Sequence, residues 1–178
     1  MERVIRIIQQ DRLRLAAIDA LYSLNLPDGY LAAGFVRNAV WDYLHSKSEP
    51  TELNDVDVIY FDAQEAEPDK YRDYELSLSK LVPSLNWQVR NQALMHIRND
   101  DAPYKSSLNA MSYWPEKETA VGIRKLSNGR LDCISAFGFD SLFNLELTHN
   151  NKRSLSVFEE RVKSKGWLGT WPSLNIVY

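Results

Sequence analysis

The 178-residue sequence has a single cysteine, Cys133, and this scarcity excludes an internal disulfide bond and any cysteine-rich zinc site. Cys133 lies in an apolar, strand-like stretch. A free cysteine in such a place is more often a small buried side chain than a nucleophile. We therefore expect Cys133 to belong to the core.

The sequence also lacks an excess of positive charge. It has 21 lysine and arginine residues against 24 aspartate and glutamate residues, for a formal charge of −3. Proteins that hold nucleic acid by its backbone usually carry a clear basic excess. We therefore expect no extended duplex nucleic-acid footprint, whereas a few local cations would suffice to hold a small anionic substrate.

Long hydrophobic runs are absent as well, since no stretch approaches the roughly 20 apolar residues of a membrane-spanning helix. The N-terminal segment MERVIRIIQQDR is interrupted by charge, unlike a signal peptide. We expect a cytoplasmic protein with no membrane partner. The length and the 44% hydrophobic content predict a single domain over residues 1–178, with a core of about 1–98 and a C-terminal extension of about 99–178.

The first part of the chain alternates between helical and strand-like patterns. We expect helices over 3–24 (with a break capped by Asp11), 35–45 and 70–81, and strands over 30–33, 55–61 and 87–97, the last with its final residues open to a helical conformation. This alternation is typical of an α/β core with a mixed sheet.

The extension has its own signals. Asn128-Gly129 predicts a hairpin between 119–126 and 130–134, and helices are expected over 107–113 and near 140–147. A last helix should begin at Ser156, with Glu159 completing a capping box, and end near Gly166 before an apolar tail that packs back on the body. The predicted fold is therefore α/β (α+β), a mixed sheet flanked by helices, with a C-terminal hairpin and helical extension.

Two aspartates, Asp55 and Asp57, stand two residues apart on the strongest predicted strand. Alternation along a strand points both carboxylates to one side. Two hard oxygen ligands at this spacing suit Mg²⁺ or Mn²⁺, with substrate phosphates completing the coordination. The other interpretation is a turn residue and a solvated edge residue, because a chain with 13 aspartates contains about one Asp-x-Asp by chance.

Gly34 follows a short strand and opens a helix. The free N–H groups and positive dipole of a helix start favour phosphate, and glycine permits close approach of the backbone. Arg37 and Asn38 could add donors to phosphate oxygens. Taken alone, Gly34 is better explained by a tight turn from strand to helix, because a single glycine is a weak phosphate signature. The combination of this helix start, one helix and then a strand with paired acids is what indicates a site.

In this order of motifs the chain resembles nucleotidyltransferases of the DNA polymerase β-like superfamily, and more closely a bacterial nucleotidyltransferase-like family. The resemblance runs through AAGFVRNAVWDYLH (32–45), LNDVDVIYFD (53–62), WQVRNQALMH (87–96) and AFGFDSLFNLEL (136–147). It implies a nucleotidyltransferase-type fold and transfer of a nucleoside monophosphate from a nucleoside triphosphate. The acceptor is not identified by the resemblance.

Carried over by position, the resemblance implies that Asp55 and Asp57 are the catalytic, metal-binding residues. It assigns nucleotide binding to the helix start, namely Gly34, Phe35, Arg37 and Asn38. Phe35 stands where related enzymes have Ser or Gly, and Asn91 falls about where a third carboxylate is expected. These departures leave two hypotheses, a transferase with changed chemistry or a catalytically inactive relative that binds a nucleotide or a protein partner.

Three further residues are candidates for the same cleft: Asn91, His96 and Arg124. His96 could contact phosphate or a base, or could be structural. Arg124 on the hairpin could meet phosphate or lie on a solvated strand face. Trp87 and Trp114 could stack on a base, although most tryptophans of a compact domain belong to the core.

Overall fold

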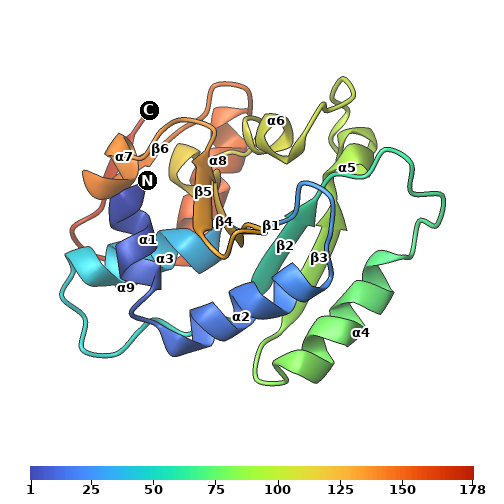
Figure 1. Cartoon of the computed structure of the whole chain (residues 1–178). Coiled ribbons are helices and arrows are strands. Elements are labelled where there is room, and N and C mark those ends of the chain that lie inside the picture. Colours follow the sequence, from blue (N-terminus) through green and yellow to red (C-terminus); the bar gives the residue numbers. More distant parts are fainter.

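A five-stranded mixed sheet forms the centre of the molecule, with its strands in the order β3-β2-β1-β4-β5 (Figure 1). In this computed structural model, which describes residues 1–178, the strands are β1 (Tyr30–Ala32), β2 (Val56–Tyr60), β3 (Trp87–Asn91), β4 (Val121–Lys125) and β5 (Leu131–Ser135). β2 and β3 are parallel, and every other neighbouring pair is antiparallel. The predicted fold class is confirmed.

Helices cover both faces of this sheet. They are α1 (Glu2–Ile8), α2 (Arg12–Ser23), α3 (Gly34–Leu44), α4 (Tyr71–Leu81), α5 (Gln92–Asn99), α6 (Ser107–Met111), α7 (Asp140–Phe143), α8 (Leu155–Lys165) and α9 (Trp167–Thr170), with a 3₁₀ turn at Lys117–Thr119. A separate parallel pair, β6 (Glu146–Thr148) and β7 (Asn175–Val177), lies near the C-terminus. None of the helices is long and apolar enough to cross a membrane.

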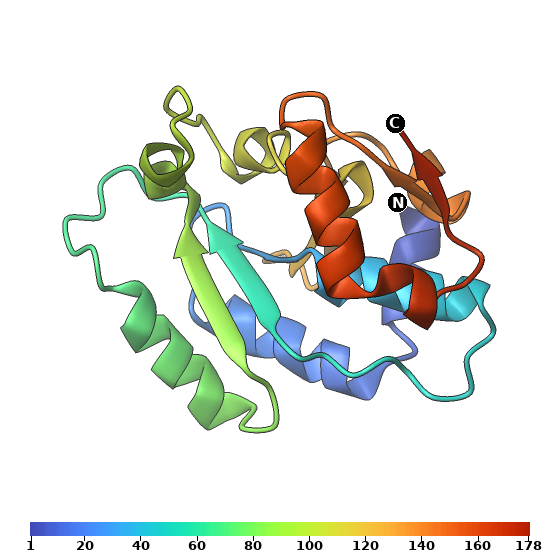
Figure 2. The same ribbon diagram turned by 180° about the vertical axis from the view of Figure 1, so that it is seen from behind.

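The alternation of side chains along β2 and β3 divides the sheet into two unlike faces. Val56, Val58 and Val89 are fully buried and belong to the main core, on the face where α2 and α4 pack. Asp57 and Arg90 point the other way and are only half-buried. Figure 2 shows this second face of β2 and β3, with α8 at its side. β2 and β3 therefore place Asp57 and Arg90 on the face that α2 and α4 do not cover.

Several predicted local signals are confirmed. The Asp11 side chain accepts a hydrogen bond from the backbone N–H of Arg14 and caps α2. Gly166 adopts a φ of 62° at the end of α8, a conformation that glycine adopts without steric cost. Cys133 is buried, and burial raises the pKa of its thiol to about 12, as expected for a core side chain. Trp167 and Trp171 of the tail are buried as well.

Three predicted elements differ from the structure. The strand expected over 87–97 ends at Asn91, whose side chain accepts from Ala93 N at 3.0 Å and so starts α5. The helix expected over 140–147 ends at Phe143, because the chain takes a positive φ at Leu145 and enters β6. The last helix starts at Leu155 instead of Ser156, without a side-chain cap, so the capping box was a wrong prediction.

Candidate active site

A cleft of about 570 Å³ opens over the polar face of β2 and β3. Two groups of side chains form its opposite sides. The α3–α8 wall consists of Gly34, Arg37, Asn38, Arg161 and Lys165. The β3–α5 wall consists of Gln88, Arg90, Gln92, Met95, Arg98 and Asn99. Asp55 and Asp57 line the floor between the two walls.

The two carboxylates of the floor differ in their surroundings. Asp55 lies just before β2, is exposed, and accepts a hydrogen bond from Asn86 Nδ2 at 2.6 Å. Asp57 lies on β2 and is half-buried. Burial raises the pKa of Asp57 above its ordinary value, Arg37 opposes that shift, and the charge of Asp55 adds to it. A pair of this kind favours a bound cation, because the cation offsets both the desolvation and the repulsion.

The turn from β1 into α3 aims the start of the helix at the cleft. Ala33 adopts a φ of 55° and a ψ of −123°, a conformation that costs a residue with a Cβ atom about 1 kcal/mol or more. Its N–H donates to Val121 O at 3.0 Å, which ties the turn to β4. At Gly34 an added Cβ would lie 3.4 Å from Asn38 Nδ2 and 3.5 Å from an Arg37 nitrogen. The bare glycine leaves that space open.

Arg37 is a buried cation with neutral partners. Its side chain donates to Thr119 Oγ1 at 2.6 Å and to Asn38 Oδ1 at 3.0 Å, and only 6% of the residue is exposed. The guanidinium lies 4.6 Å from the Trp167 ring centroid and 5.0 Å from that of Trp41. Burial lowers the pKa of Arg37 to about 10, so the group stays charged at neutral pH. With no carboxylate in ion-pair contact, its charge remains available to an incoming anion.

Two cations of α8 complete this wall, and sequence reasoning did not assign them to the site. Arg161 pairs with the buried carboxylate of Glu116. Lys165 lies one turn later, is exposed, and lowers the pKa of Asp57 by its charge. Their i, i+4 spacing on an amphipathic helix is a sequence signal for a shared face. Only the packing of α8 beside Trp167 shows that this face borders the cleft.

Phe35 does not enter the cleft, contrary to its predicted place in the nucleotide-binding set. The residue is completely buried and belongs to the main core. Its carbonyl accepts from Arg14 Nε at 2.9 Å. At the second residue of α3 the side chain points inward, so what this position can offer the cleft is its backbone N–H.

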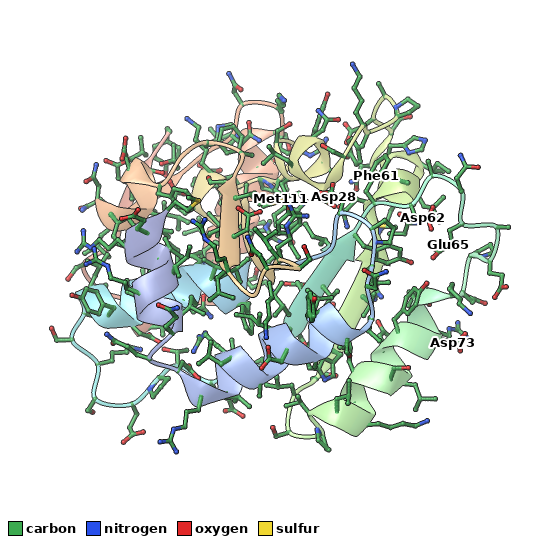
Figure 3. The ribbon with its side chains drawn as sticks, viewed as in Figure 1. Asp28, Phe61, Asp62, Glu65, Asp73 and Met111 are labelled. Carbon is green, nitrogen blue, oxygen red and sulfur yellow. The ribbon has the colours of Figure 1, made fainter.

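Asn91 is also displaced from the predicted cleft. It lies on the core face of β3, opposite to Arg90, and is buried. Its side chain accepts from Asp62 N at 3.1 Å and donates to Asp62 O at 2.8 Å and to Glu65 at 3.1 Å. Figure 3 shows Asp62 and Glu65 in the loop that follows β2. Asn91 therefore holds a loop, and it does not occupy the position of a third cleft carboxylate.

The residue of β3 that faces the cleft beside Asp57 is Gln88, its partner in the parallel register. His96 and Arg124, the other two predicted cleft residues, do not line the cleft. His96 Nδ1 lies 2.8 Å from Ala93 O. Arg124 pairs with Asp132 at 3.1 Å. For both residues the structure favours the other interpretation left open by the sequence, a structural histidine and an arginine on a strand face outside the cleft.

The two tryptophans considered for base stacking differ in exposure and in position relative to the cleft. Trp87 is 5% exposed and lies in the main core. Trp114 is half-buried and lines the cleft. Trp114 therefore offers an aromatic surface to the cleft that Trp87 cannot.

The fold and the cleft together define a nucleotidyltransferase-type domain. A family model described as Nucleotidyltransferase matches residues 19–176, and the chain belongs to that family. The search of curated proteins found no relative that matches. Among solved structures, one described as "The NMR structure of the protein reveals a CCA-adding enzyme head domain" is similar, with a TM-score of 0.85 and 28% identity over 99% of this chain and 95% of that chain. Family and fold confirm the predicted resemblance and support a general role in nucleotidyl transfer.

Proposed function

We propose that the cleft binds a nucleoside triphosphate together with a divalent cation and transfers the nucleoside monophosphate to an acceptor. One observation carries this proposal. The start of α3, the buried cation of Arg37 and the Asp55–Asp57 pair converge on one cleft, although they come from different elements. Phosphate and divalent metal are the two ligands that these groups suit.

The donor set fits a divalent metal. Asp55 and Asp57 supply hard oxygen atoms from one side of the floor, and a cation bound there would offset the burial that raises the pKa of Asp57. In the proposed site these two residues would hold Mg²⁺ or Mn²⁺. When bound, the metal would neutralise phosphate charge and activate the attacking oxygen.

The α3–α8 wall would bind and orient the triphosphate. The first N–H groups of α3 have no partner within the helix and point their positive dipole end at the cleft. Arg37 adds a charged donor whose position is fixed by Thr119 and Asn38. Arg161 and Lys165 add charge from α8. Positioning of this kind contributes to rate by placing the α-phosphorus for attack by the acceptor oxygen, with pyrophosphate leaving.

Trp114 is the proposed platform for the nucleobase. Of the three tryptophans that line the cleft, Trp167 and Trp171 are 4% and 2% exposed, whereas Trp114 is half-buried. Stacking on an aromatic side chain tolerates any base, because every base has a π face. The platform therefore supports binding without selecting one of the four nucleotides.

A second candidate function is nucleotide binding without turnover. It is favoured by Gln88, which stands beside Asp57 where an acid would add a third carboxylate. An amide cannot take up a proton from the acceptor. In this alternative the cleft holds the nucleotide as a ligand or as a signal for a partner.

One experiment separates the two functions. Pyrophosphate release is measured with each of the four nucleoside triphosphates, Mg²⁺ and a panel of hydroxyl acceptors, beside nucleotide binding by calorimetry. The proposed transferase predicts release that Asp57→Asn reduces by about 10³-fold or more, while Asp69→Asn, a change of an exposed acid outside the cleft, has no effect. Binding without release in every reaction would favour the second function. No binding and no release would contradict both.

A further inference from the structure

Positive charge lies on both sides of Asp57. β2 is the central member of the series β3-β2-β1, so β3 borders it on one side and the β1–α3 turn on the other. Arg37 and Lys165 on the first side and Arg90 on the second all lower the pKa of Asp57 by their charge. A triphosphate bound along the α3–α8 wall would use the cations on one side only.

The β3–α5 wall is a continuous surface set by two regular patterns. Gln88 and Arg90 are two residues apart on β3, roughly 7 Å along the strand, and both line the cleft, although the Arg90 guanidinium reaches back to Glu75 of α4. From Gln92 the chain continues as α5, and Gln92, Met95 and Asn99 recur at i, i+3 and i+7 with Arg98 beside them. One strand face and one helix face therefore join at the end of β3.

The polar groups of this wall are cations and amides without a single acid. Arg90 has a partner, since its NH1 atom lies 2.9 Å from Glu75 Oε1 and its guanidinium 4.9 Å from the Tyr71 ring centroid. Arg98 is exposed and takes part in none of the ion pairs of the chain. Gln92 is 95% covered, with its amide nitrogen 3.3 Å from Arg90 O. This wall is therefore complementary to an anion that accepts hydrogen bonds.

We propose that the β3–α5 wall is a second anion subsite, which holds a phosphate or carboxylate group of the acceptor through Arg98 and the neighbouring amide side chains of the wall. The inference rests on the proposed function and names the class of its acceptor, a small anionic molecule. The subsite lies across β2 from the α3–α8 wall, so an acceptor bound there faces the nucleotide over the Asp55–Asp57 floor. The cleft volume suits small molecules, and the formal charge of −3 opposes binding of a long polyanion.

The test uses inorganic phosphate and acetate as probes on the full chain. Residues 88–99 are followed by amide NMR while each probe is titrated into protein saturated with Mg²⁺ and a non-hydrolysable triphosphate. We expect phosphate, acetate or both to shift these amides in the wild-type protein. Arg98→Gln should weaken probe binding about tenfold, and Arg98→Lys should restore part of it. Arg72→Gln, which removes an exposed arginine of α4 outside the cleft, is the matched control.

Nucleotide affinity of the same variants, measured by calorimetry, decides which anion uses the wall. An unchanged affinity in Arg98→Gln supports a separate acceptor subsite. A loss of nucleotide affinity equal to the loss of probe binding would overturn the inference, because the wall would then hold the triphosphate itself. Tighter, Arg98-dependent binding of a single-stranded oligonucleotide than of either probe would also overturn it.

The two proposals can fail separately. A wild-type protein that binds no nucleotide, but whose residues 88–99 still respond to phosphate in an Arg98-dependent way, would contradict the proposed function and keep the second subsite. A wild-type protein that binds nucleotide and shows no response to either probe would contradict the second subsite alone.

Discussion

The two walls of the cleft carry similar charge but are built in opposite ways. The α3–α8 wall is anchored in the core, since Arg37 is 6% exposed and packs against both Trp41 and Trp167. The β3–α5 wall lies at the edge of the sheet, and its Arg98 is exposed at the end of a short helix. A fixed cation loses little entropy on binding its ligand, whereas an exposed one can adjust to different ligands. We infer that the first wall suits an invariant ligand and the second a variable one.

Burial explains why the first wall is rigid. Phe35 fills the core directly beneath the start of α3, and Ala33 is held in its strained conformation by the hydrogen bond to Val121. At the second wall, β3 is an edge strand whose Val89 N–H donates to a side chain, Glu75, at 2.9 Å. The cation of the first wall is therefore embedded in the core, whereas Arg98 of the second wall is exposed.

The largest effect should come from breaking the support under the first wall. Phe35→Ser places a small polar side chain in a fully buried site, and we expect unfolding to become easier by about 4 kcal/mol. Nucleotide affinity should not rise in this variant, because the new hydroxyl points into the core. Denaturant unfolding and calorimetry measure the two quantities. Phe35→Leu, which keeps an apolar side chain, is the control, and tighter nucleotide binding by Phe35→Ser would contradict the assigned orientation.

Removing the fixed cation tests the first wall directly. Arg37→Met keeps an apolar stem against the two tryptophans and deletes the charge, so we expect nucleotide affinity to fall about 100-fold through lost charge-assisted hydrogen bonds. Arg90→Gln on the other wall should change it by less than about threefold if the walls are separate. Calorimetry with the same nucleotide compares them. Equal losses of nucleotide affinity in Arg37→Met and Arg90→Gln would show that both walls bind the nucleotide.

A smaller effect is expected at the floor between the walls, where Asp57 should make stability depend on pH. Because the pKa of Asp57 is raised in the folded state, the folded protein binds more protons than the unfolded chain just above the ordinary aspartate pKa. Stability contributed by this residue therefore falls as pH rises through that window. Asp57→Asn should melt at a higher temperature than the wild type at pH 7, and the gain should vanish at pH 3.

Divalent metal supplies the complementary measurement on the same pair of proteins. Mg²⁺ or Mn²⁺ bound at Asp55 and Asp57 should raise the melting temperature of the wild type in proportion to binding, and should leave Asp57→Asn unchanged. If Asp57→Asn is less stable than the wild type at pH 7 without metal, protein cations already compensate the Asp57 carboxylate.

The smallest effect concerns the strained turn that starts the first wall. Ala33→Gly relieves a positive φ that glycine adopts without cost, and we expect stability to rise by up to about 1 kcal/mol. Ala32→Gly, at a buried strand position next to it, should instead lower stability by about 1 kcal/mol. Thermal unfolding compares the pair. A loss of stability at position 33 equal to that at position 32 would argue against strain in the turn.

The cleft residues that the sequence marks by local signals lie on the floor and at the start of α3. Asp55, Asp57 and Gly34 lie at local signals, a strand with alternating polarity and a helix start, which depend on neighbouring residues only. Asn91 was assigned to the wrong face of β3. Side chains alternate along a strand, so a shift of one residue moves a side chain from the cleft to the core. Gln88 lines the cleft because the parallel register pairs it with Asp57.

Long-range packing accounts for the other differences. No local pattern marks Glu146–Thr148 as a strand, because its partner Asn175–Val177 lies some thirty residues later and supplies the pairing. Arg161 and Lys165 carry an ordinary amphipathic spacing that gives no hint of which surface lies opposite. Their role beside Arg37 follows only from the docking of α8 against Trp167.

The amino-acid sequence by itself determined the α/β class, the glycine-led helix start and the paired aspartates, since hydrophobic periodicity and turn chemistry act over a few residues. Tertiary structure alone decided that Phe35 faces the core, that Asn91 holds a loop, and that cations from α3, α8 and α5 line one cleft with Asp57. These outcomes depend on strand order and helix docking, which bring together residues far apart in the sequence, such as Arg37 and Lys165.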